Sequence, residues 1–229
     1  MIFTPKRKCS QDLNLQINGE MITRVYETKF LGVILDHKLN WKAHILHVKN
    51  KISKTLGIPY KARQILGRSY LISLYNTLVV PYLSYCNIVW GGVNLTSLDP
   101  LIKIQKRAIR CICNLKRRAS TSEYFQMTRL LKLVDINQYS QIIFIYKFSK
   151  GMLPDIFNHF FKYNNEIHSY RTRQSNLFHA PKFNSFLSKS FITYSGVLAW
   201  NAICKNVSTD LCLNGFKKCV KKLFLHNYA

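Results

Sequence analysis

The chain has 229 residues, of which 48% are hydrophobic, and it carries 34 Lys and Arg against 10 Asp and Glu, a net charge of +24. This length and hydrophobic content suffice to bury a core, which excludes a chain that stays unfolded for lack of apolar residues. The large positive charge favours a polyanionic partner, nucleic acid first and the phosphate headgroups of a membrane second.

The cysteines and the N-terminal sequence bear on the compartment. Seven cysteines are odd in number and unevenly placed, unlike the regular disulfide framework of small secreted domains. The N-terminal MIFTPKRKC has a basic run at residues 6–8, which fits a solvated turn better than a nuclear import signal, and no apolar segment follows it. We therefore expect an intracellular protein, cytoplasmic or nuclear.

The beginning of the chain predicts β structure. Leu13, Leu15 and Ile17 alternate with polar neighbours, and an Asn-Gly pair at 18–19 is typical of a hairpin turn. The β-branched run FLGVIL at 30–35 then predicts a strand that is buried.

Apolar residues recur at helical spacing from Trp41 to Leu56. Asn40 is placed to cap this helix, and Gly57 with Pro59 is placed to end it. The opposite side of the helix carries cationic and titratable side chains three and four residues apart. They are His44, His47, Lys51 and Lys54, and Lys42 precedes them. We interpret this side as facing solvent or phosphates rather than a metal, since neighbouring ammonium groups repel a cation.

Residues 70–98 contain no charged side chain, and their length would suffice to cross a bilayer. Polar residues and Pro81 interrupt the segment, while leucines and tyrosines recur at helical spacing. We predict a buried helix from about Ser69 to Trp90, interrupted at Pro81, and a membrane span is the alternative.

A third helix is predicted with Ser97 as its N-cap, and its polar side forms a cationic ridge opposite an apolar stripe. The ridge consists of Lys103, Lys106, Arg107 and Arg110, and the cluster Lys116, Arg117 and Arg118 follows it. Residues 37–122 hold fifteen Lys or Arg against the single acidic residue Asp99. Such a ridge fits a phosphate backbone, whereas a solvated helix face usually has interspersed acidic residues.

The rest of the chain predicts further helices over about 121–131 and 135–150, a loop-rich connector over 160–190, and closing helices near 191–203 and 211–226. A few tyrosines beside basic residues are candidate stacking platforms for unpaired bases. They are Tyr60, Tyr124 and Tyr170.

The sequence has no local signature of catalysis. Two-metal chemistry needs converging carboxylates, and no two acidic residues lie within six positions of each other. Cys204, Cys212, Cys219 and His226 follow at intervals of eight, seven and seven, too wide on a helix for one zinc ion. We interpret these cysteines as buried thiols, and we predict no catalytic residue, no metal site and no cofactor.

Five segments follow one another in the order FLGVILDHKLNWKAHI, SLYNTLVVPYLSYCNIVWG, LIKIQKRAIRCI, SYRTRQS and SFITYSGVLAWN. This order resembles the C-terminal part of reverse transcriptases from non-LTR (LINE-type) retrotransposons, the RNA-directed DNA polymerases of these transposable elements. The resemblance implies that the FLGV strand is the primer grip at the edge of the palm, and that the following helices form the thumb domain. It also implies contacts with RNA, DNA or an RNA:DNA hybrid through the backbone, with low sequence selectivity.

The resemblance further implies that the palm motif with paired aspartates, which binds Mg²⁺ in these enzymes, precedes the FLGV strand and is missing here. We therefore expect a fragment that does not polymerise alone. Two alternatives remain open: a decayed gene product with no retained role, and a thumb subunit that is active with a palm supplied in trans. After Trp200 and Asn201 the chain departs from the Leu-Pro pair usual in relatives, which leaves the role of the tail open.

We expect a mainly α chain in three parts. Residues 1–36 would form the palm-edge β-hairpin and the primer-grip-like strand, residues 37–118 a thumb-like helical domain, and residues 119–229 a helical C-terminal region. The predicted nucleic-acid-binding residues are Phe30, Leu31, Gly32, Val33, Lys42, His44, His47, Lys51, Lys54, Lys103, Lys106, Arg107, Arg110, Lys116, Arg117 and Arg118.

Overall fold

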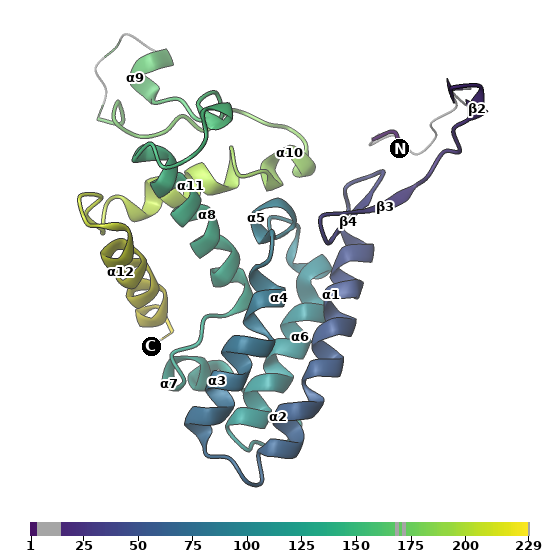
Figure 1. Ribbon diagram of the computed structural model, residues 1–229. Helices are drawn as coiled ribbons and strands as arrows, with labels where there is room; N and C mark the ends of the chain where they lie inside the picture. Colours follow the sequence, from purple (N-terminus) through teal and green to yellow (C-terminus); the bar gives the residue numbers. More distant parts are fainter. Residues whose placement is uncertain (4–14, 168–169, 171–172, 229) are drawn as a thin grey trace.

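The structure, a computed structural model, describes residues 1–3, 15–167, 170 and 173–228. The chain is mainly helical, as the sequence predicts, and it has two small β-hairpins near the N-terminus (Figure 1). The basic run at 6–8, Leu13 and part of the SYRTRQS segment lie outside the described residues.

The strands are β1 (Gln16–Ile17), β2 (Glu20–Met21), β3 (Glu27–Phe30) and β4 (Val33–Asp36). The helices are α1 (Lys42–Thr55), α2 (Gly57–Ala62), α3 (Arg68–Leu78), α4 (Val80–Ser84), α5 (Asn87–Trp90), α6 (Leu95–Ile112), α7 (Ser122–Met127), α8 (Leu133–Ser149), the 3₁₀ turn η1 (Asp155–Phe157), α9 (Asn164–Ile167), α10 (Phe186–Ser190), α11 (Ser195–Ile203) and α12 (Leu213–His226).

Both hairpins are antiparallel and two-stranded. The predicted Asn-Gly turn joins β1 to β2, and both of its residues have positive φ angles, 52° and 83°. The prediction of one buried strand over FLGVIL is wrong, because Leu31 and Gly32 form a second turn with φ angles of 45° and 83°. Two positive φ angles in a two-residue loop are what a tight hairpin needs, and glycine supplies the second at no steric cost.

The turn from β4 into α1 is organised by the carboxylate of Asp36, which is buried. This carboxylate accepts hydrogen bonds from the backbone N–H groups of Lys38, Asn40 and Trp41, at 3.0, 3.2 and 2.9 Å. Trp41, in a left-handed conformation with φ 63°, occupies the N-cap position of α1, where Asn40 was predicted. Because one side chain satisfies three backbone donors, the chain passes from strand to helix within a few residues.

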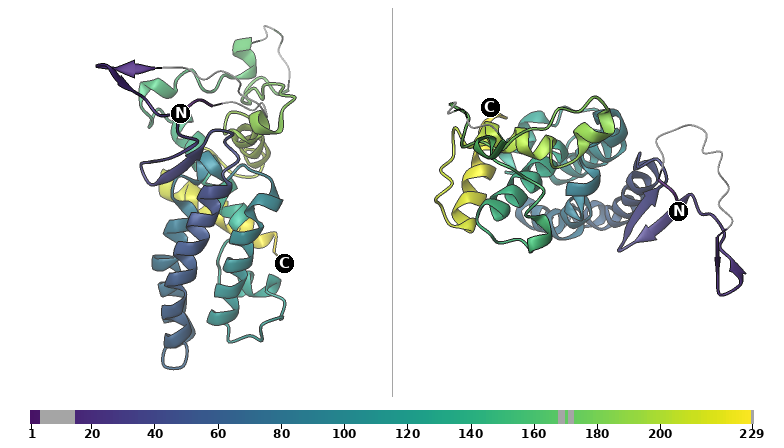
Figure 2. Two further views of the ribbon diagram at one scale, coloured as in Figure 1. Left: turned by 90° about the vertical axis from the view of Figure 1, so that its right-hand side faces the viewer. Right: turned by 90° about the horizontal axis from the view of Figure 1, so that it is seen from above.

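The helices that follow form an elongated bundle, in which α1 and α6 pack along each other (Figures 1 and 2). Gly57 and Pro59 do not end the helical path as predicted, since α2 continues it from Gly57. The uncharged segment is interrupted near Pro81, as predicted, and forms α3, α4 and α5. Pro81 lies in the first turn of α4, where backbone N–H groups have no partner within the helix, so proline loses no helical hydrogen bond there.

None of the helices among the described residues is both long and apolar enough to cross a membrane.

The N-cap of α6 is Asn94 rather than the predicted Ser97, because the Asn94 side-chain oxygen accepts a hydrogen bond from the Ser97 N–H at 2.9 Å.

The buried hydrophobic residues form two clusters. The first joins β4 to α1, α3, α6 and the start of α8, up to Ile136. The second begins at Ile142 and joins the rest of α8 to α11 and α12. Helix α8 therefore connects the bundle to the C-terminal helices (Figure 1). The predicted division after residue 118 stays a prediction.

The cysteines among the described residues are all free of disulfide bonds. Cys204 and Cys219, predicted to be buried, are half-buried, and partial burial raises the pKa of Cys204 to about 11. Cys212, predicted to be buried, is exposed, and its sulfur accepts from the Gly215 N–H at the start of α12. Within the described part of the chain, no three His, Cys, Asp or Glu side chains form a group that could hold a metal ion.

Candidate nucleic-acid interface

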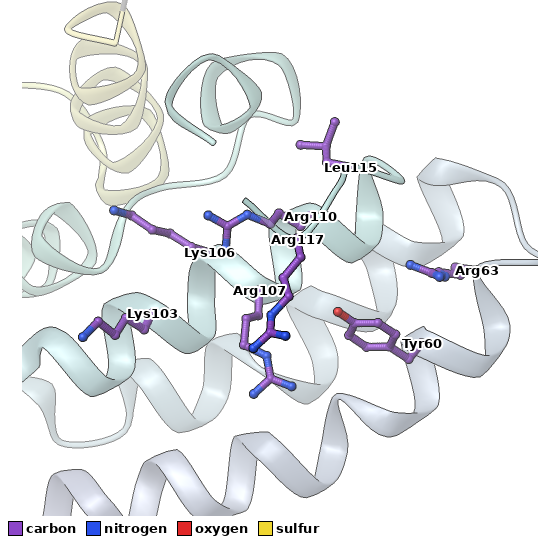
Figure 3. A pocket seen from close by; sticks show the side chains of 8 residues that line it. All are labelled: Tyr60, Arg63, Lys103, Lys106, Arg107, Arg110, Leu115 and Arg117. Carbon is purple, nitrogen blue, oxygen red and sulfur yellow. The ribbon is translucent and has the colours of Figure 1, made fainter. Parts of the chain in front are cut away.

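Helix α2, helix α6 and the loop after α6 surround a hollow of about 650 Å³, which we call the cationic hollow (Figure 3). Six cationic side chains, one tyrosine and one leucine line it, and no acidic residue does. They are Tyr60, Arg63, Lys103, Lys106, Arg107, Arg110, Leu115 and Arg117.

The sequence builds this hollow from an amphipathic helix and a chain reversal. Along α6 the apolar stripe is buried against α1, so that Lys106 and Arg107 are exposed on the other side. Arg110 is half-buried, and its Nε donates a hydrogen bond to the carbonyl of Ala119 at 3.0 Å. This bond holds the loop against α6, so that the side chain of Arg117 lies next to that of Arg107 (Figure 3).

The positive charge is uneven along the ridge. Lys103 forms an ion pair with Asp99, one turn earlier, at 2.6 Å between Nζ and Oδ2. Lys106 and Arg107 have no acidic partner within the described parts of the chain. The positive charge at the end of α6 nearest α2 is therefore the least neutralised. A phosphate group would have its most favourable electrostatic interaction there.

Five predicted binding residues meet in the cationic hollow, namely Lys103, Lys106, Arg107, Arg110 and Arg117. Lys116 and Arg118 are exposed on the same loop but do not line it.

Sequence reasoning missed Arg63, because a single arginine on a short helix has no periodic pattern. Of the three predicted stacking platforms, Tyr60 lines the hollow. Tyr124 is half-buried against the core, and Tyr170 is exposed but does not line the hollow. Tyr60 and Arg63 are in contact, with the guanidinium carbon 5.1 Å from the centre of the ring.

A second basic site, which we call the hairpin pocket, lies between the β3–β4 turn, α1 and α4, with a volume of about 330 Å³. Its lining includes Lys29 from β3 and His47 with Lys51 from α1. The Tyr85 hydroxyl donates a hydrogen bond to the Leu31 carbonyl at 2.6 Å and so fixes the turn above the pocket. Burial and the two nearby lysines lower the pKa of His47.

The FLGV residues are divided by the turn. Phe30 and Leu31 are 63% and 74% exposed at its tip, whereas Val33, the first residue of β4, is buried. Gly32 alone of the four lines the hairpin pocket, and its Cα faces the Tyr85 ring. The other predicted residues of α1, Lys42 and Lys54, are exposed and line neither site.

The prediction that His44 faces solvent or phosphates is wrong, since the side chain is 2% exposed. Its Nδ1 accepts a hydrogen bond from the Ile34 N–H at 3.3 Å, and its ring meets Trp90 edge-on at 5.3 Å. Helix α1 is covered by β4 on one side and by α6 on another, so its buried surface is wider than the single stripe predicted. Burial lowers the pKa of His44 to about 4.

The buried His44 should make stability depend on pH. Its pKa is about 4 in the folded chain and 6.5 ordinarily, so the unfolded chain takes up a proton as the pH falls through 6.5. This contribution to stability is complete above pH 6.5 and is lost between pH 6.5 and 4, a loss of about 3 kcal/mol. Urea unfolding at pH 7.5 and pH 4.5 measures it. His44→Gln should remove this part of the pH dependence. His47→Gln should keep most of it, because burial is the larger cause of the His44 shift and the charge of His47 the smaller one. An equal loss in His44→Gln would contradict the assignment.

Part of the chain is similar in sequence to a reverse transcriptase of a mobile element. Over 100 residues, 42% of its length, it is 31% identical to the RNA-directed DNA polymerase from mobile element jockey of Drosophila funebris. The chain spans 11% of the length of that relative. No protein-family model matches the chain, and no solved structure matches it.

Proposed function

We propose that this chain binds nucleic acid through the backbone phosphates, as the thumb-like and C-terminal part of a non-LTR retrotransposon reverse transcriptase. The observation that carries the proposal is the cationic hollow, in which six cations converge without an acidic residue. The similarity to the jockey polymerase supports it, because such an enzyme copies an RNA strand into DNA. The proposal concerns binding and assigns no catalytic residue and no cofactor.

The partner follows from the chemistry of the two basic sites. Arginine and lysine side chains recognise phosphate groups, which RNA, DNA and their hybrid share, so little sequence selectivity is expected. The hairpin pocket and the cationic hollow lie towards opposite ends of α1, whose 14 residues span about 21 Å. A nucleic-acid partner would place the protein in the cytoplasm or the nucleus.

Removing charge from the cationic hollow should weaken binding and reduce its salt dependence. We expect the triple variant Lys106→Ala, Arg107→Ala and Arg117→Ala to bind at least tenfold more weakly at 0.1 M salt. Each phosphate contact releases about one counterion from the nucleic acid on binding, and the variant loses this favourable release at three contacts. The slope of log affinity against log salt should become shallower by about 2 to 3. Fluorescence anisotropy with single-stranded RNA, duplex DNA and an RNA:DNA hybrid measures both quantities.

The matched control removes three exposed lysines from the C-terminal part, Lys150→Ala, Lys189→Ala and Lys205→Ala. It changes the net charge equally but leaves the cationic hollow intact, so its affinity and slope should stay near those of the unaltered chain. If the two triple variants behave alike, diffuse charge rather than the hollow holds the nucleic acid.

A second candidate function is that of a thumb subunit completed by a palm domain supplied in trans. The observation that favours it is the exposure of β3 and of the apolar residues at the hairpin tip, Phe30 and Leu31. Strands with free edges pair readily with a further strand. Mixing the chain with such a palm and measuring primer extension tests this proposal, and absence of nucleotide incorporation would refute it.

A further inference from the structure

The cationic hollow has a feature that phosphate binding alone does not require. Tyr60 is 40% exposed and lines the hollow together with the apolar Leu115. The Arg63 guanidinium lies over the Tyr60 ring, and the side chains of Arg107 and Arg117 reach toward the same opening beside it (Figure 3). An aromatic ring and several cations thus share one open hollow.

We infer that the cationic hollow binds one unpaired nucleotide of a nucleic-acid strand, with the base stacked on Tyr60 and the adjoining phosphates held by Arg107 and Arg117. This inference rests on the proposed function and specifies its ligand at this site. Every base has a π-face, so stacking on tyrosine selects unpaired bases without selecting their sequence.

The accessible ring of Tyr60 distinguishes this ligand from a duplex. The bond from Arg110 to Ala119 folds the loop back, so that Arg117 and Leu115 border the open hollow beside α6. A volume of about 650 Å³ lies within the range of pockets for small organic ligands. Base pairs inside a duplex stack on their neighbours, and their faces are closed to a protein ring. An accessible aromatic ring with cations beside it therefore fits an unpaired base better than a base inside a duplex.

The partners of Tyr60 prepare it for stacking. Arg63 covers one face of the ring at 5.1 Å from its centre, a cation–π contact that holds the ring in place. The base takes the face that remains open to the hollow. The scarcity of acidic side chains at this end of α6 leaves the flanking phosphates without a competing anion.

Two single strands of equal charge test the inference. One is a 12-nucleotide oligothymidylate, and the other is a 12-nucleotide strand of abasic residues with the same phosphates and no bases. The unaltered chain should bind the oligothymidylate about tenfold more tightly than the abasic strand. Tyr60→Leu should remove this preference, and Tyr60→Phe, which keeps the aromatic face, should retain it. Tyr70→Leu, at a 64% exposed tyrosine on α3 outside the hollow, is the matched control and should retain it as well.

The outcomes separate this inference from the proposed function. Equal binding of both strands by the unaltered chain, with affinity that falls as salt rises, would overturn the stacked base and leave phosphate binding intact. A preference that survives in Tyr60→Leu would also overturn it. If neither strand binds at any salt concentration, the proposed function fails too. The comparison of strands on the unaltered chain needs no variant to fold.

Discussion

Replacing Gln105 by leucine is expected to lower the free energy of unfolding by about 3 kcal/mol or more, although leucine suits the apolar stripe of α6. Gln105 is 1% exposed, and its Nε2 donates to the Tyr75 hydroxyl and the Leu131 carbonyl at 2.9 and 3.0 Å. Its Oε1 accepts from the Leu133 N–H at 2.9 Å. Leucine would leave these buried groups without their partner, and each costs about 1–3 kcal/mol.

Thermal unfolding followed by circular dichroism measures this effect. A loss of about 3 kcal/mol in a chain of this length lowers the midpoint by about 6–12 °C. Gln126→Leu, the same change at an exposed position of α7, should alter stability by less than about 0.5 kcal/mol. A midpoint shift as small in Gln105→Leu as in the control would show that these three hydrogen bonds contribute little.

Gly91→Ala should lower the free energy of unfolding by about as much as Gln105→Leu, because the added methyl group has no space. An added Cβ would lie 2.5 Å from the Asn87 carbonyl oxygen and 2.6 Å from the side-chain carbon of Asn137. Both asparagines are buried, and they join α5 to α8 because Asn87 donates to Asn137 and Asn137 donates to the Gly91 carbonyl. The methyl group would displace this network, and overpacking together with unpaired amides costs about 3 kcal/mol or more.

Gly57→Ala is the matched control for this substitution. Its added Cβ would meet no atom within 4 Å, and the residue begins α2. Alanine there should leave stability unchanged or raise it by up to about 1 kcal/mol, because the unfolded chain loses freedom. Urea unfolding of both variants gives the comparison. Equal stability of the two would mean that the turn after α5 yields without strain.

Periodic patterns in the sequence predicted much of the helical part. The cationic ridge was predicted because Lys103, Lys106 and Arg107 recur at helical spacing opposite apolar residues, and the structure confirms that α6 buries the other side. The Asn-Gly turn between β1 and β2 was predicted from two residues that tolerate positive φ. In both cases the prediction depends only on residues that are close together in the sequence.

Contacts between distant segments caused the errors. FLGVIL has the composition of one strand, but Gly32 forms a turn that the hydroxyl of Tyr85, the residue after α4, holds in place. His44 has the spacing of an exposed residue, but β4 and Trp90 bury it. Neither Tyr85 nor Trp90 could be placed from the sequence around the residues they contact.

The sequence by itself determined that the chain is mainly helical, strongly basic and equipped with an amphipathic helix that carries Lys106 and Arg107, because composition and spacing are local properties. The tertiary structure alone decided that Arg117 and Arg63 meet that helix around Tyr60. The physical reason is that the loop reversal depends on the Arg110 to Ala119 hydrogen bond and on packing between α2 and α6. A site lined by several elements arises only when those elements meet.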